Sequence, residues 1–162
     1  MALTPLRPVT DTNVLLASEK SKSATSPNRE YIQRWRNDEF TFLYSEDTLL
    51  EYIKKMQEKH ISEDSIKKFL GALFELGVQV YIAFYHLPVY PVDPDDIAFL
   101  LCADNGEATH LLTYDRHLEA LTTHSRCAVP LSSSRTSVTS CQRKVERRSM
   151  RPRSAVLPSR PP

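Results

Sequence analysis

The sequence is poor in the residues that build several common functional sites. Its only glycines are Gly71, Gly77 and Gly106, which stand alone, so there is no glycine-rich loop to surround a nucleotide phosphate. The three cysteines are odd in number and lack C-x-x-C spacing, and the five histidines lack H-x-x-x-H spacing. These absences argue against a disulfide framework and a structural zinc site, and the cysteine usage fits a reducing cytoplasm.

Long apolar runs are missing as well. The most apolar stretch, residues 70–85, is interrupted by Glu75 and Gln79, and the N-terminal MALTPLRPV has no apolar core like that of a signal peptide. We therefore expect neither membrane insertion nor secretion, and a cytoplasmic location. The remaining composition, 41% hydrophobic and 25% charged over 162 residues, is ordinary for one compact globular domain.

The net charge of +1 hides two oppositely charged parts. Residues 1–121 carry 12 Lys and Arg against 19 Asp and Glu, a net charge of −7, whereas residues 122–162 carry 9 against 1, a net charge of +8. The later part is rich in Ser, Arg and Pro and has no sustained apolar period. We expect a folded domain over 1–121, with a possible extension to 133, and a basic, disordered tail over 134–162.

Apolar periodicity within the first part predicts alternating strands and helices. Ser45 and Ser62 each precede acidic residues and a helical apolar pattern, so both are expected to cap helices, and Gly77 is expected to end the second one in a left-handed conformation. The predicted strands are 5–10, 40–45, 78–84 and 109–114, and the predicted helices are 28–37, 46 to about 59, 63–76, 96–103 and 116–121. This order is typical of an α/β protein, a three-layer α/β/α sandwich with a central, mainly parallel sheet.

Acidic residues follow the ends of the predicted strands. Asp11 follows the first strand, Asp96 opens the helix after the third, and Asp115 follows the fourth. The carboxyl ends of parallel strands meet at one edge of the sheet, where ligands bind in such folds. Carboxylates gathered there repel one another unless a divalent cation neutralises them, and Mg²⁺ or Mn²⁺ suits oxygen ligands.

Each acid also has a simpler interpretation. Asp11 can be a turn or cap residue, and Asp115 can cap the predicted helix that follows it. Asp96 can be merely the N-cap of its helix, with Asp93 and Asp95 as alternative candidates. The residues alone leave these alternatives open.

Four segments together resemble the PIN-domain nucleases, especially the bacterial PIN-domain toxins of toxin–antitoxin pairs. The segments are DTNVLLAS, SEDTLLEYIKKM, DPDDIAFLLCAD and LLTYDRHL, which stand in the family's order and approximate spacing. The resemblance covers residues 5–121. The family closes its sheet with one more short strand after the predicted helix at 116–121. In this chain the best candidate for that strand is CAVPL at 127–131.

The resemblance implies an acidic tetrad of Asp11, Glu51, Asp96 and Asp115 that holds Mg²⁺ or Mn²⁺ for phosphodiester hydrolysis. Asn13 and Thr113 match polar positions that support those acids. The function so implied is a metal-dependent endoribonuclease that acts on single-stranded RNA and is the toxin of a toxin–antitoxin pair. A cognate antitoxin would be its protein partner, a homodimer is compatible with it, and the alternative is a catalytically inactive scaffold that binds RNA or a partner.

Without the resemblance, Glu51 would not be singled out. A helical wheel with Leu49, Leu50, Ile53 and Met56 on the core face puts Glu51 about 170° away, where a solvated glutamate paired with Lys54 or Lys55 is the simple expectation.

Six cations are candidate contacts to the RNA backbone: Lys20, Lys22, Arg29, Arg34, Arg36 and Arg116. Each is equally explained as a solvated surface charge.

Two other folds that place acids at strand ends fit less well. The phosphatases with an aspartyl nucleophile after the first strand need a second Asp two residues on, and that position is Asn13. Phospho-acceptor receiver domains carry an Asp at the end of the third strand, and this region reads FYHLPVYP here. Neither pattern is met.

Overall fold

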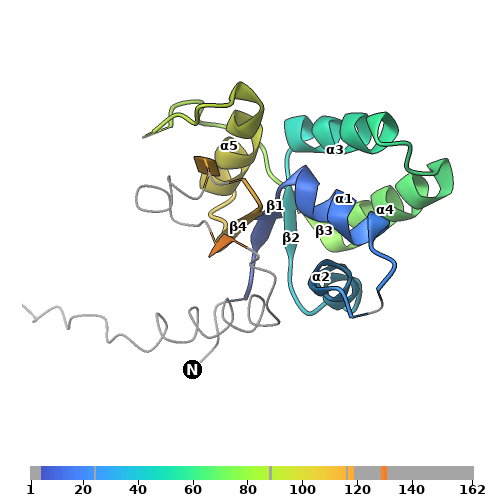
Figure 1. Cartoon of the computed structure of the whole chain (residues 1–162). Coiled ribbons are helices and arrows are strands. Elements are labelled where there is room, and N and C mark those ends of the chain that lie inside the picture. The colour runs from blue at the N-terminus through green and yellow to red at the C-terminus, as the bar shows by residue number, and fades with distance from the viewer. Residues whose placement is uncertain (1–4, 24, 88, 116, 119–128, 131–162) are drawn as a thin grey trace, which may run out of the picture.

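The fold is organised around a five-stranded parallel sheet, seen in a computed structural model that describes residues 5–23, 25–87, 89–115, 117–118 and 129–130 (Figure 1). The strand order is β3-β2-β1-β4-β5, and every neighbouring pair is parallel. The strands are β1 (Pro8–Thr10), β2 (Phe42–Tyr44), β3 (Gly77–Gln79), β4 (His110–Thr113) and β5 (Val129–Pro130). Their carboxyl ends therefore share one edge of the sheet.

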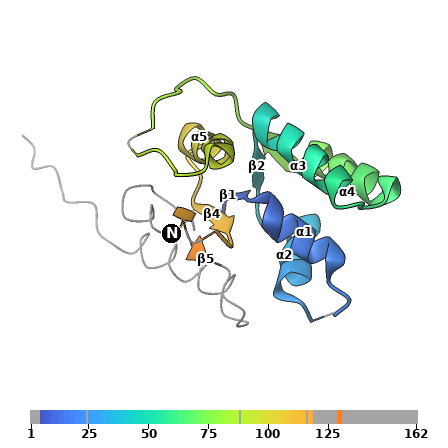
Figure 2. The ribbon, with the colours of Figure 1, turned by 45° about the horizontal axis from the view of Figure 1, so that its top comes forward.

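Helices cover both faces of this sheet (Figures 1 and 2). They are α1 (Thr12–Lys20), α2 (Pro27–Arg36), α3 (Glu46–Glu58), α4 (Glu63–Leu76) and α5 (Ile97–Asn105), and a 3₁₀ turn (Pro94–Asp96) precedes α5. The first four lie on one side of the sheet and α5 lies on the other. The predicted α/β/α architecture is confirmed.

The predicted helix starts at Ser45 and Ser62 are confirmed. The Ser45 hydroxyl accepts from the Thr48 backbone N–H at 3.3 Å while the Thr48 hydroxyl accepts from the Ser45 N–H at 2.8 Å, and Ser62 caps α4 through Ser65. In contrast, α1 was not predicted. Its apolar residues Val14, Leu15 and Leu16 are consecutive and all buried, so the helix has no one-sided apolar pattern for a sequence to display.

The predicted strand over 78–84 is wrong beyond Gln79. Tyr81 and Phe84 are 81% and 71% exposed, although the segment reads as a buried strand. Val80 still bonds to β2, because its N–H donates to the Tyr44 carbonyl at 2.7 Å. Further along, the backbone bonds to a side chain: the Asn105 Oδ1 accepts from the N–H groups of Ala83 at 2.9 Å and Phe84 at 2.8 Å. Asn105 thus holds this segment beside the end of α5.

Gly77 ends α4 as predicted, but not in a left-handed conformation. Its φ is −88°, which any residue adopts, so the need for glycine is steric. A Cβ atom at this position would lie 2.5 Å from the Leu73 carbonyl oxygen and 3.1 Å from a ring carbon of Tyr44. Gly77 therefore lets the chain pass closely from α4 into β3.

We expect Gly77→Ala to destabilise the protein by about 1–3 kcal/mol, because the added methyl group meets a backbone oxygen that cannot move alone. Gly71→Ala is the matched control. Gly71 lies inside α4, and a Cβ atom added there would enter open space, so alanine should stabilise by about 0.5–1 kcal/mol through helix propensity. Urea unfolding of both variants measures the difference, and equal effects of the same sign would contradict the steric explanation.

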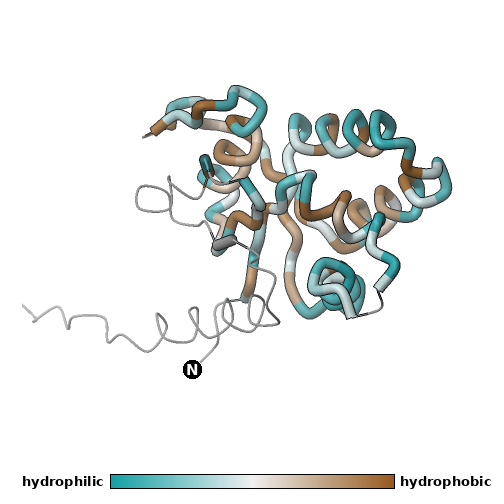
Figure 3. The backbone as a smooth tube through the Cα atoms, viewed as in Figure 1, coloured by the Kyte–Doolittle hydropathy of each residue, from teal (hydrophilic) through white to brown (hydrophobic). Residues whose placement is uncertain are grey.

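The main core lies between the sheet and α1 to α4. Trp35, Phe42, Tyr52 and Phe69 are buried and their rings contact one another at centroid distances of 4.9–6.5 Å. Apolar stretches are visible on α1, α4 and α5 (Figure 3). This packing fixes α3 against the sheet, and α3 carries one of the predicted site residues.

The C-terminal predictions are tested only in part. β5 falls within the CAVPL segment and pairs with β4 through Leu112 and Val129, so that segment does supply the closing strand. The predicted tail over 134–162 and most of the predicted helix over 116–121 lie outside the described residues. Among the helices of the described part, none is long and apolar enough to cross a membrane.

Candidate active site

Asp11 is fixed at the carboxyl end of β1. Its backbone N–H donates to the Leu112 carbonyl at 2.8 Å, which continues the β1–β4 pairing by one residue. Its side chain caps α1 by accepting from the Asn13 N–H at 3.2 Å, so the cap predicted as a simpler alternative is real. Asp11 is only 4% exposed. A helix cap does not need such burial, so capping alone does not explain the position of this carboxylate.

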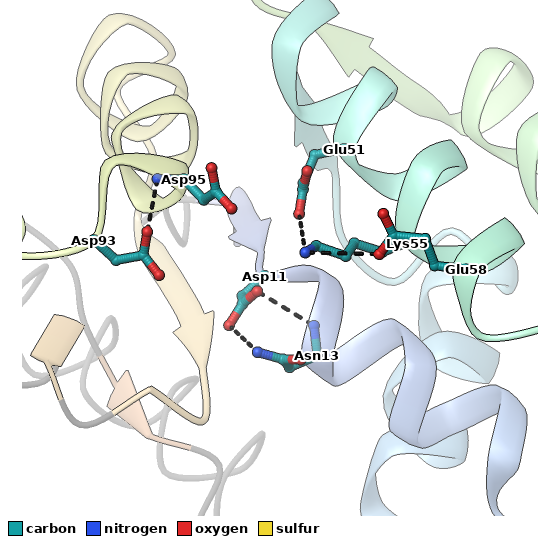
Figure 4. Close-up of polar contacts among 7 residues, drawn as sticks. All are labelled: Asp11, Asn13, Glu51, Lys55, Glu58, Asp93 and Asp95. Atoms are coloured by element: carbon teal, nitrogen blue, oxygen red, sulfur yellow. Dashed lines mark hydrogen bonds and ion pairs between the residues drawn. The ribbon is translucent and has the colours of Figure 1, made fainter.

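Thr113 and Asn13 both contact the Asp11 carboxylate, as Figure 4 shows for Asn13. The Thr113 hydroxyl donates to Oδ2 at 2.6 Å, and the Asn13 side-chain amide lies 3.5 Å from the same oxygen. Burial raises the pKa of Asp11, and the hydrogen bonds from Thr113 and Asn13 act against that rise. Thr113 also accepts from the Asp115 N–H at 2.9 Å, so one hydroxyl ties the ends of β1 and β4 together.

Asp96 is the last residue of the 3₁₀ turn and directly precedes α5. It occupies the cap position of α5 but makes no capping bond, whereas Asp93 caps the turn by accepting from the Asp95 N–H at 3.0 Å. Asp96 is 8% exposed, and its buried Oδ2 has no hydrogen-bond partner among the described residues. Burial, followed by the charges of Asp115 and Asp11, raises the pKa of Asp96 to about 7.

Asp115 is half-buried, two residues beyond the end of β4. Its Oδ1 accepts from the His117 N–H at 2.7 Å, which is the local bond that the simpler interpretation predicted. Its charge nevertheless raises the pKa values of both Asp11 and Asp96. The structure therefore brings these three aspartates within electrostatic reach of one another.

Glu51 lies on α3 across from the 3₁₀ turn, and its side chain is 17% exposed. Burial raises its pKa, Lys55 opposes the rise, and Asp95 adds to it. Figure 4 shows the carboxylates of Glu51 and Asp95 on opposite sides of the space above Asp11. Glu51 thus stands beside Asp95, one of the alternatives weighed against Asp96.

The helical-wheel description of α3 is wrong. Leu50 is 62% exposed, whereas Tyr52 is fully buried together with Thr48 and Met56. Successive residues are separated by about 100° around a helix, so Glu51 flanks the true core face instead of opposing it. The predicted ion pair with Lys55 is present at 3.8 Å, but the expected solvated side chain is not.

Tyr52 is a residue of the site that sequence reasoning missed. Its hydroxyl donates to the Thr10 carbonyl at 2.6 Å, and the Thr10 hydroxyl in turn shares a 2.7 Å hydrogen bond with Tyr31. This contact ties α3, which carries Glu51, to the residue before Asp11. An aromatic residue on a helix predicts only core packing, so the sequence holds no signal for this hydroxyl contact.

The donor set fits a hard divalent cation. Among the described residues, no three His, Cys, Asp or Glu side chains are already arranged to hold a metal ion. The acids are nevertheless buried or half-buried, repel one another, and include the unpartnered Asp96 Oδ2. Carboxylate oxygens of this kind suit Mg²⁺ or Mn²⁺, which would remove the repulsion that separates them.

Those predicted RNA-contacting cations that fall among the described residues lie on or beside α1 and α2. Arg34 is paired with Glu39 at 2.6 Å, so it is engaged within the fold. Lys20, Lys22, Arg29 and Arg36 are exposed, and Arg116 lies outside the described residues. None of the exposed cations has a described contact with the acids.

A protein-family comparison agrees with this geometry. The family model described as the PIN domain matches residues 7–117, more than half of the 162 residues and a range that includes all four predicted acids. No match was found among curated proteins.

Proposed function

The chain belongs to the PIN-domain family, whose members are generally nucleases, and from this premise we propose that it is a metal-dependent endoribonuclease. Asp11, Glu51, Asp96 and Asp115 would hold Mg²⁺ or Mn²⁺, and Asn13 and Thr113 would orient Asp11. The observation that carries the proposal is the unpartnered, buried Asp96 Oδ2 beside Asp11 and Asp115. Such a group is costly to keep without a cation.

A divalent cation held by these four acids would activate a water molecule for attack on a phosphodiester and would stabilise the leaving oxygen. The protein's own residues hold the Asp11 carboxylate in position. Thr113 and the Asn13 N–H fix both oxygens of Asp11, and Tyr52 fixes the backbone immediately before it. Burial of Asp11 and Asp96 limits competing water at the carboxylates, which strengthens their interaction with a cation.

The test is cleavage of labelled single-stranded RNA, single-stranded DNA and duplex RNA by the metal-stripped full-length protein, with Mn²⁺, with Mg²⁺ and with EDTA. We expect cleavage of single-stranded RNA with either ion and none with EDTA. Binding of RNA without cleavage under every condition would instead support the inactive scaffold. Cleavage that is insensitive to EDTA would contradict the proposed metal chemistry.

The toxin role is the finer part of the proposal. Induced expression in a bacterial host should arrest growth, and the variant Asp11→Asn should not, because arrest by an RNase toxin depends on cleavage. A partner that relieves the arrest would be the expected antitoxin. Equal arrest by both proteins would count against a nuclease toxin.

A further inference from the structure

We infer that Lys55 is the internal counter-cation of the site, which holds Glu51 in the metal-free protein and binds an RNA phosphate when a divalent cation takes Glu51 from it. This inference rests on the proposed nuclease function and assigns a substrate-binding role to a residue outside the acidic tetrad. The phosphate that Lys55 would bind is the one next to the scissile bond.

Lys55 is placed between two acids of its own helix. Its Nζ lies 3.8 Å from Glu51 Oε1 and 3.9 Å from Glu58 Oε2. In Figure 4 the ammonium group points from α3 toward the space that Asp11, Glu51 and Asp95 surround. Lys55 lowers the pKa of Glu51 more than Lys54 does, so of these two lysines Lys55 is the one that acts more strongly on this predicted ligand.

The two ion pairs are loose. Both N–O distances exceed the length of about 2.7–2.9 Å that charge-assisted hydrogen bonds adopt, and the Lys55 side chain is 32% exposed. Pairs of this kind on a helix surface contribute little to stability and cost little to break. Lys55 is therefore held near Glu51 without being locked to it.

A divalent cation at Glu51 would change the partner of Lys55. The cation and the ammonium group compete for one carboxylate and repel each other, so occupancy of the site weakens the Lys55–Glu51 pair. A lysine has a flexible stem and acts as a point charge toward phosphate. Its nearest new anion would be the backbone of the RNA strand bound at the acids, because phosphate contacts are what position nucleic acids on proteins.

The test compares Lys55→Gln with Lys54→Gln in the full-length protein. Lys54 precedes Lys55 on α3 and is more exposed, so its variant removes the same charge from nearly the same place. Two measurements are made: the affinity for Mn²⁺ alone by isothermal titration, and the KM and kcat for single-stranded RNA at saturating Mn²⁺. Thermal melts of each variant check the fold.

For Lys55→Gln we expect Mn²⁺ to bind roughly three- to tenfold more tightly, since its competitor is gone. We expect KM for RNA to rise roughly tenfold with kcat nearly unchanged, and the salt dependence of binding to fall by about one phosphate contact. Lys54→Gln should change neither affinity by more than about twofold. A helix-stabilising pair alone would move neither measurement.

Unchanged or weaker Mn²⁺ binding by Lys55→Gln would overturn the counter-cation role, and an unchanged KM would overturn the phosphate contact. Either result refutes the inference. The proposed function would still hold if the wild-type protein cleaves RNA in a metal-dependent way. If the wild-type protein neither binds Mn²⁺ nor cleaves RNA, the proposed function fails and the inference falls with it. Equal changes in both lysine variants would also refute it, because they would reflect net charge only.

Discussion

Asp11→Asn is expected to lower the rate of RNA cleavage on the order of 10²–10³-fold or more while the protein stays folded. Asparagine keeps the shape of the side chain but removes the charge that would hold the divalent cation. It has one carbonyl oxygen, so it can accept from the Asn13 N–H or from Thr113, which use different oxygens of Asp11. The lost hydrogen bond costs about 1 kcal/mol, and removing a buried charge offsets this cost.

The measurement is single-turnover cleavage of labelled RNA at saturating Mn²⁺, with circular dichroism melts of the same samples. Asp104→Asn is the matched control, because Asp104 is exposed near the end of α5 and should tolerate the same substitution. If the Asp11→Asn variant cleaved RNA at the wild-type rate, Asp11 would not be part of the proposed site. A loss of activity shared by the control would point to a charge effect unrelated to metal binding.

Asp96→Asn is expected to stabilise the metal-free protein, increasingly so as the pH rises. The ordinary pKa of Asp is 3.8, and the pKa of Asp96 in the folded protein is about 7. Well below pH 4 the group is protonated in both states and contributes nothing. Between pH 4 and 7 the folded state keeps a proton that the unfolded state releases, so stability falls as pH rises and levels off above pH 7.

Asparagine does not titrate, so the variant lacks this loss. A shift of this size would correspond to a maximum of about 4 kcal/mol, and solvent screening near the site reduces the expected gain at pH 8 to on the order of 2 kcal/mol. Urea unfolding in EDTA at pH 4, 6 and 8 measures it. A difference between the variant and the wild type that does not change with pH would contradict the assignment of this pKa to Asp96.

The elements that the sequence predicted best are those whose signals are local. The Ser45 and Ser62 caps and the lengths of α3 and α4 follow from residues within a few positions of one another. The failures have non-local causes. α1 is buried on all sides of its apolar run, and the strand expected to continue past Gln79 is diverted by the side chain of Asn105, which comes from α5.

The candidate site divides in the same way. The acids after β1 and β4 could be placed at one edge because parallel topology brings strand ends together, and the structure does bring Asp11, Asp96 and Asp115 within reach of one another. The position of Glu51 could be predicted only with the correct core face of α3. That face contains Tyr52, which is buried, and not Leu50, which is exposed. The hydroxyl contact between Tyr52 and Thr10 spans 42 residues, and no local pattern predicts it.

The central claim is that the acids at this sheet edge form one divalent-cation site. Isothermal titration of the metal-stripped full-length protein with Mn²⁺ at pH 8, where Asp96 is ionised, tests it most directly. The account predicts saturable binding by the wild-type protein that is lost in both Asp11→Asn and Asp96→Asn and kept in Asp104→Asn. No saturable binding by the wild type, or unchanged binding in both site variants, would contradict it.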